Sequence, residues 1–168
     1  MSFKGEAVFR PHPFFYVLEP FARIRLYHGL LKDTIAESMI ATKTCVAMTN
    51  THRMPKKGEQ FILQNYIPVG QLRVVGKELA APLKEGESML KFEVVIPTDY
   101  VLLSGSSPAN GILDGTPYSG PRQLQAGTHE FQLAEKGQPV TLFWDRAYEL
   151  GFRPKSKDFM PERVGSEF

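Results

Sequence analysis

Hydrophobic and polar residues alternate with a period of two in the second half of the chain. Residues 89–96 are apolar at every second position from Leu90 onward, with Lys91 and Glu93 between. The stretch 129–133 shows the same alternation. This period is typical of strands that bury one face and expose the other. We therefore predict half-buried strands in both stretches.

Turn signals divide the region 111–144 into short segments. An Asp-Gly pair at 114–115 is the strongest of them, because this dipeptide favours a tight hairpin. An Ala-Gly pair at 126–127 and the segment 136–139 mark further turns. Strands joined without helices favour a β-sandwich or a partly open barrel, with Trp144 closing its core.

The first part of the chain shows helical spacing instead. Apolar residues after Pro20 predict a helix that begins there and ends at Gly29 or Asp33. A second short helix is predicted over 35–40, capped by Asp33 or Thr34.

A strand, a short helix and a strand follow in that order. We predict a buried strand over 44–49, a helix over 59–66 and a strand over 72–76. This order suggests a small α/β unit with parallel pairing. One further helical turn is predicted at 145–150, before Gly151.

The predicted fold class is α+β, a small α/β unit followed by an antiparallel β-sandwich-like domain. Residues 1–79 would form the helical and α/β unit, 80–154 the sandwich-like domain and 155–168 a flexible tail.

Composition narrows the class of protein. Of the 168 residues, 42% are hydrophobic and 23% are charged, which is typical of a globular chain. The net charge of +2 gives no reason to expect nucleic acid as a partner. No apolar run approaches the ~20 residues needed to cross a bilayer, and the start lacks the layout of a signal peptide. We expect a soluble chain, or a soluble piece of a longer protein.

The sequence offers little chemistry. Cys45 is the single cysteine and is expected to pack as a small apolar residue. The four histidines are scattered, so we expect neither a metal site nor a cofactor. No nucleophile elbow or phosphate-binding loop is present, so no catalytic residue is predicted. Asp114 is the most obvious acid, but Gly115 beside it favours a role in the turn.

A set of polar and aromatic residues near the predicted hairpins is the candidate binding site. Aromatic faces stack on sugar rings, and Arg or Asp can bond hydroxyl groups. The candidates are Tyr118, Arg122, His129, Trp144 and Asp145. Each also has a structural alternative, because Trp144 can fill a core and Arg122 adjoins a proline in a turn.

A second candidate surface lies near the N-terminus. Phe14 and Phe15 belong to a dense apolar run, and Arg23 and Arg25 follow in the predicted helix. Aromatic residues usually serve packing, so this run is first expected to be a core segment. The alternative is a patch that contacts a membrane or a partner protein, with the arginines near anionic headgroups.

Several passages resemble a known family. Residues 60–69 and 72–79 resemble the extracytoplasmic C-terminal part of bacterial multi-spanning glycosyltransferases that use lipid-linked sugars, including those like dolichyl-phosphate-mannose protein mannosyltransferases. Residues 113–121, 126–131 and 144–152 are similar to the β-domain appended to some of these enzymes, and to short surface β-domains of the Pro-Glu-Gly-Ala type. The family's catalytic acids lie in and between membrane spans, so none is carried over to this chain.

Three hypotheses follow. The resemblance implies a non-catalytic accessory domain on the periplasmic side, whose partner is the transmembrane part of a glycosyltransferase or the membrane surface. The alternative is a free-standing carbohydrate or cell-envelope binding module that contacts a glycan. The third is a small enzyme whose site would bring Asp114, His129 and Asp145 together in one pocket.

Overall fold

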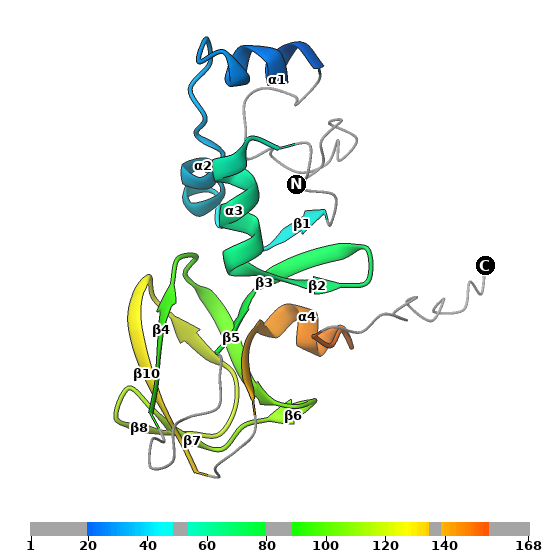
Figure 1. Ribbon diagram of the computed structural model, residues 1–168. Helices are drawn as coiled ribbons and strands as arrows, with labels where there is room; N and C mark the ends of the chain where they lie inside the picture. The colour runs from blue at the N-terminus through cyan, green and yellow to red at the C-terminus, as the bar shows by residue number, and fades with distance from the viewer. Residues whose placement is uncertain (1–19, 49–53, 80–88, 135–138, 155–168) are drawn as a thin grey trace, which may run out of the picture.

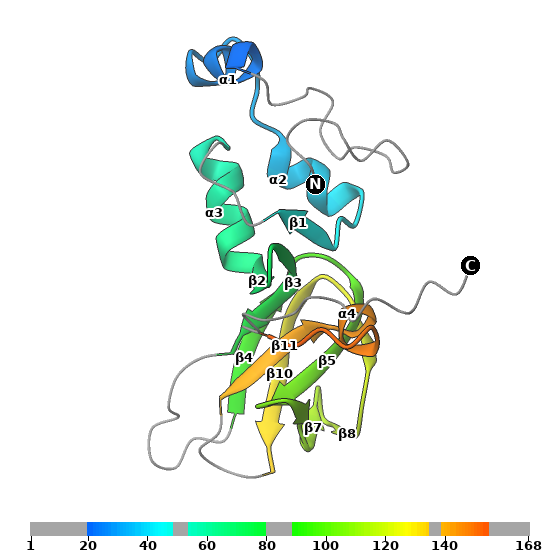
Figure 2. The same cartoon turned by 90° about the vertical axis from the view of Figure 1, so that its right-hand side faces the viewer.

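The computed structural model describes residues 20–48, 54–79, 89–134 and 139–154. In this part of the chain the strands form two antiparallel sheets, and short helices lie against them or beyond them (Figures 1 and 2). The elements are α1 Pro20–Tyr27, α2 Ile35–Ala41, β1 Val46–Met48, α3 Lys56–Asn65, β2 Tyr66–Val69, β3 Leu72–Glu78, β4 Met89–Val94, β5 Thr98–Ser104, β6 Ser107–Pro108, β7 Gly111–Leu113, β8 Thr116–Tyr118, β9 Arg122–Leu124, β10 Gly127–Leu133, β11 Val140–Trp144 and α4 Asp145–Glu149. The predicted α+β class with a sandwich-like arrangement of strands is confirmed.

The larger sheet has the order β1-β3-β11-β5-β6, with β2 added beside β3 and β9 beside β5. The smaller sheet has the order β4-β10-β7-β8. The main core lies where apolar residues of both sheets meet, among them Phe92 and Phe131 from the smaller sheet and Leu102 and Leu142 from the larger one.

The alternation in 89–96 corresponds to strand β4, which ends two residues earlier at Val94, and that in 129–133 is confirmed as part of strand β10. Phe92 and Val94 are buried while Lys91 and Glu93 are exposed, as expected for a strand with one buried face. The two strands pair with each other in antiparallel register, His129 opposite Phe92.

A second apolar cluster covers the other face of the larger sheet. Val101, Leu103 and Phe143 belong to it, and Ala147 of α4 packs against them. The strands β5 and β11 are therefore buried on both faces, which explains their continuous apolar runs.

The parallel pairing predicted for the α/β unit is wrong. β1 and β2 both pair with β3 in antiparallel register. Strand β2 was not predicted from the sequence. It follows α3 without a break, and the chain turns from β2 back into β3 through Gly70 at φ +57°. Because this hairpin comes between the helix and β3, the chain enters β3 in the direction opposite to the expected one.

The first two helices begin close to the predicted positions. α1 begins at Pro20, and the chain leaves it through Gly29 at φ +71°. The cap of α2 comes from Asp33, whose Oδ1 accepts a hydrogen bond from the Ile35 amide at 3.2 Å, whereas Thr34 makes no side-chain cap bond. α3 begins at Lys56, three residues before the predicted start.

Strand β3 connects the two predicted units. Its first residues pair with β1 along one edge and with β2 along the other, and its last residues pair with β11, so one sheet crosses the expected boundary at residues 79 and 80. The division into two domains stays a prediction. The segments 155–168 and 136–138 lie outside the described residues.

No helix among the described ranges is long and apolar enough to cross a membrane.

Candidate functional site

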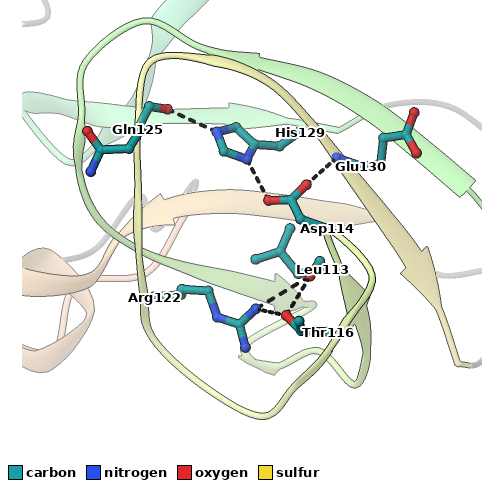
Figure 3. Close-up of polar contacts among 7 residues, drawn as sticks. All are labelled: Leu113, Asp114, Thr116, Arg122, Gln125, His129 and Glu130. Atoms are coloured by element: carbon teal, nitrogen blue, oxygen red, sulfur yellow. Dashed lines mark hydrogen bonds and ion pairs between the residues drawn. The ribbon is translucent and has the colours of Figure 1, made fainter.

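The Asp114-Gly115 turn is the centre of the polar cluster drawn in Figure 3. It joins β7 to β8 with both residues at positive φ, +49° and +75°, as a tight hairpin turn requires. The predicted role of Asp114 in a turn is therefore confirmed. Its carboxylate does more than close the turn, because Oδ1 accepts a hydrogen bond from the Glu130 amide at 2.9 Å. The side chain thus ties the hairpin to β10.

His129 contacts the other carboxylate oxygen of Asp114. The distance from Nδ1 to Asp114 Oδ2 is 2.7 Å, and that from Nε2 to the Gln125 carbonyl is 2.9 Å. Both partners are acceptors, so both ring nitrogens must donate, and only the imidazolium form of histidine can do this. The ring also stacks on Phe92, with centroids 5.7 Å apart.

The electrostatics of the Asp114–His129 pair agree with an imidazolium. Burial alone would lower the pKa of His129, but the Asp114 carboxylate and the Gln125 carbonyl outweigh it and raise the pKa. Burial alone would raise the pKa of Asp114, but the Glu130 amide and the His129 ring outweigh it and lower the pKa. Each partner therefore favours the charged form of the other.

Arg122 forms hydrogen bonds with β8, the strand that follows the same turn. Its Nη1 donates to Thr116 Oγ1 at 2.5 Å, and its Nη2 donates to the Pro117 carbonyl at 2.8 Å. The guanidinium lies over the Tyr118 ring, 5.8 Å from the centroid. The guanidinium group of Arg122 therefore binds backbone and side-chain groups of the protein itself.

Tyr118 is a core residue. It is buried, its hydroxyl accepts a hydrogen bond from the Leu102 amide at 2.7 Å, and its ring meets Phe131 edge to face. The hydroxyl therefore links the two sheets across the core.

Trp144 and Asp145 lie at the junction of β11 and α4. Trp144 is half-buried, packs against both apolar clusters and pairs in register with Tyr100, which in turn pairs with Arg122 of β9. Oδ1 of Asp145 is buried and has no hydrogen-bond partner among the described residues. Burial, Glu149 and Asp99 raise the pKa of this carboxyl.

The structure thus brings together only some of the candidates. Tyr118 contacts Arg122, and His129 contacts Asp114, but no hydrogen bond or ion pair found in the described ranges joins Asp145 to either His129 or Asp114. Both ring nitrogens of His129 are occupied by protein atoms, which leaves neither of them to accept a proton from a substrate. Sugar binding by the five candidates stays a prediction.

The second candidate surface is described in part. Phe14 and Phe15 lie outside the described residues, whereas Arg23 and Arg25 lie in α1, and Arg25 is exposed.

Cys45 is half-buried, as expected for a residue that packs. Burial raises the pKa of its thiol, so the thiolate is disfavoured. Within the described ranges, no three His, Cys, Asp or Glu residues gather in a way that could hold a metal ion.

Several contacts of the cluster were not predicted, among them those of Asp114 to the Glu130 amide, of His129 to the Gln125 carbonyl, and of Arg122 to Thr116. Asp114 and His129 are 15 positions apart in sequence and meet only through the register of β7 on β10. The Asp-Gly turn was the one available sign that a carboxylate would face the neighbouring strand.

Comparison with known proteins finds no matching protein family, curated protein or solved structure.

The Asp114–His129 pair makes stability depend on pH. The raised pKa of His129 gives a contribution that is complete below about pH 6.5 and is lost as pH rises through the raised value. The lowered pKa of Asp114 gives a contribution present above about pH 4 and lost as pH falls through the lowered value. The pair is therefore strongest between those two limits.

We expect His129→Gln to lower the free energy of unfolding by about 1 kcal/mol at pH 5.5 and by less at pH 9. The figure is reduced for screening, since the Asp114 side chain is 43% exposed. Urea unfolding at a series of pH values measures it, with His28→Gln, at an exposed histidine, as the control. Parallel pH curves for wild type and His129→Gln would contradict the assignment of an imidazolium.

Proposed function

We propose that this chain is a non-catalytic accessory domain of a membrane glycosyltransferase that uses a lipid-linked sugar. In this role it lies on the extracytoplasmic side and positions the acceptor or the membrane part of the enzyme. The observation that carries the proposal is that the polar side chains of the cluster bind the protein's own backbone. Asp114, Arg122 and His129 are all bonded to backbone groups of the chain itself.

These contacts give the β-domain a rigid set of turns. The segments 113–121 and 126–131, which resemble the appended β-domain of that family, supply the hairpin residues and the strand that Asp114 joins. A side chain held by two or three intramolecular bonds contributes to shape, and shape is what a positioning domain needs.

The test is sugar transfer in membranes prepared from cells that produce the chain. Removing the coding region for residues 20–154 is expected to lower transfer from a polyprenyl-phosphate sugar to acceptor by about tenfold or more, because acceptor positioning contributes strongly to rate. Restoring the region, or restoring it with the exposed Leu150 changed to Ala, is expected to recover transfer.

Two outcomes would contradict the proposal. One is unchanged transfer after removal. The other is turnover of a sugar substrate by the purified chain alone. If transfer is unchanged while the purified chain binds envelope glycans in a manner abolished by Trp144→Ala, a carbohydrate-binding module replaces the accessory role.

A further inference from the structure

Helix α1 carries large apolar side chains that the described part of the protein does not cover. The exposed fractions are 78% for Phe21, 53% for Ile24 and 88% for Tyr27, and Leu30, just beyond the end of the helix, is 73% exposed. Single exposed apolar residues are common, but here four lie within ten positions of one segment. We call these four residues, with Arg25 and Lys32, the α1 surface.

The helix stands at the end of the molecule farthest from the sandwich, beyond α2 and α3, in both views (Figures 1 and 2). It is tied to the body on its other side, where Leu26 is half-buried against the main core. The chain then continues into α2, whose Ile35 and Met39 are fully buried. The α1 surface is thus presented outward from an anchored segment.

Charge on this segment has one sign. Between Phe21 and Lys32 the sequence contains Arg23, Arg25 and Lys32 and no Asp or Glu. Arg25 and Lys32 are exposed. In the sequence Glu19 precedes the helix, and Asp33, which follows Lys32, is half-buried and accepts a hydrogen bond from the Ile35 amide. The helix itself therefore carries cations and no acid, while Glu37 of α2 interacts electrostatically with Lys32.

We propose that the α1 surface binds the headgroup region of an anionic phospholipid membrane. A short helix with aromatic and aliphatic side chains beside exposed cations has the composition of an interfacial helix. The apolar side chains enter the headgroup–acyl boundary, and Arg25 and Lys32 meet the lipid phosphates. A protein groove could bury the same apolar residues, but the charge complementarity favours anionic lipid.

This inference goes beyond the accessory role, which does not require lipid contact by this helix. The test therefore uses only the purified full chain and lipid, and its failure leaves the sugar-transfer experiment unaffected. The probe is co-sedimentation with vesicles of phosphatidylcholine, with and without phosphatidylglycerol, at low and high salt.

Wild type is expected to bind the vesicles that contain phosphatidylglycerol, and to bind less at high salt because salt screens the charges. Arg25→Glu with Lys32→Glu is expected to weaken binding by on the order of 30-fold or more, since each cation near an anionic surface contributes a factor of about five. Phe21→Asp with Tyr27→Asp is expected to abolish detectable binding.

Control variants make the same kinds of substitution elsewhere on the protein, a double charge reversal and the replacement of an exposed apolar residue by Asp. Lys43→Glu with Arg146→Glu repeats the charge reversal at exposed positions outside α1, and Leu150→Asp replaces an apolar residue that is 54% exposed at the C-cap of α4. Both controls are expected to bind like wild type, and circular dichroism checks that every variant is folded.

Binding that is equal for neutral and anionic vesicles, or that the α1 variants leave unchanged, would overturn the proposal. So would self-association in solution that the Phe21→Asp, Tyr27→Asp variant removes while vesicle binding is absent, because a second copy would then be the occupant.

Discussion

Gly111→Ala is expected to lower the free energy of unfolding by about 3 kcal/mol, one of the two largest effects in this chain. A Cβ at this position would lie 2.2 Å from the backbone oxygen of Gln132 and 2.7 Å from the Phe131 ring. The backbone oxygen belongs to the neighbouring strand β10, and Phe131 is completely buried, so neither can move without disturbing the sheet or the core.

The Gly111→Ala substitution is also expected to disturb the polar cluster around Asp114. Gly111 begins β7, which leads directly into the Asp114 turn, and β7 pairs with β10 in the register that places Asp114 beside His129. If β7 is forced away from β10, the Asp114–His129 pair separates. The variant is therefore expected to lose the pH-dependent part of its stability as well as the packing.

Chemical denaturation of Gly111→Ala and wild type measures the effect. Gly105→Ala is the matched control, because a Cβ added there would have nothing within 4 Å, and the φ of +64° leaves only the conformational cost of about 1 kcal/mol. Equal losses for the two variants would show that the close approach of β7 and β10 is not tight in solution.

The sequence predicted strands best where one face is buried. In 89–96 and 129–133 the alternation of apolar and polar residues reflects the two environments directly, so type and orientation were both correct. Asp114 was also correctly placed in a turn, because a hairpin with positive φ at both positions favours Asp-Gly.

The hydrophobic pattern did not predict the structure correctly where one element follows another without a loop between them. β2 follows α3 without a loop, and Pro68 within it cannot donate to a ladder, so the segment lacked the signature of a strand. The missing hairpin then reversed the inferred direction of β3. The contacts of His129 were also hidden, because they depend on the pairing of β7 with β10 and not on local spacing.

Phe143→Ala is the second large effect, with an expected loss of about 3–5 kcal/mol in the free energy of unfolding. Phe143 is completely buried in the apolar cluster between β11 and α4, where Ala147 also packs. It lies opposite Val101 on one neighbouring strand and Gly76 on the other. Gly76 permits this close packing, because a Cβ there would meet the Leu142 carbonyl at 2.5 Å.

Removal of the ring leaves a cavity beneath α4 that the short helix cannot fill by collapsing, because β11 runs straight into it. Urea unfolding gives the global loss, and amide exchange of residues 145–149 reports whether α4 loosens first. Phe143→Leu, which keeps most of the volume, is expected to lose about 1.5 kcal/mol or less. Phe61→Ala is the control at a half-buried ring on α3, with an expected loss of about 1 kcal/mol. If Phe143→Ala were no more destabilising than Phe61→Ala, α4 would not be a packed layer of the fold.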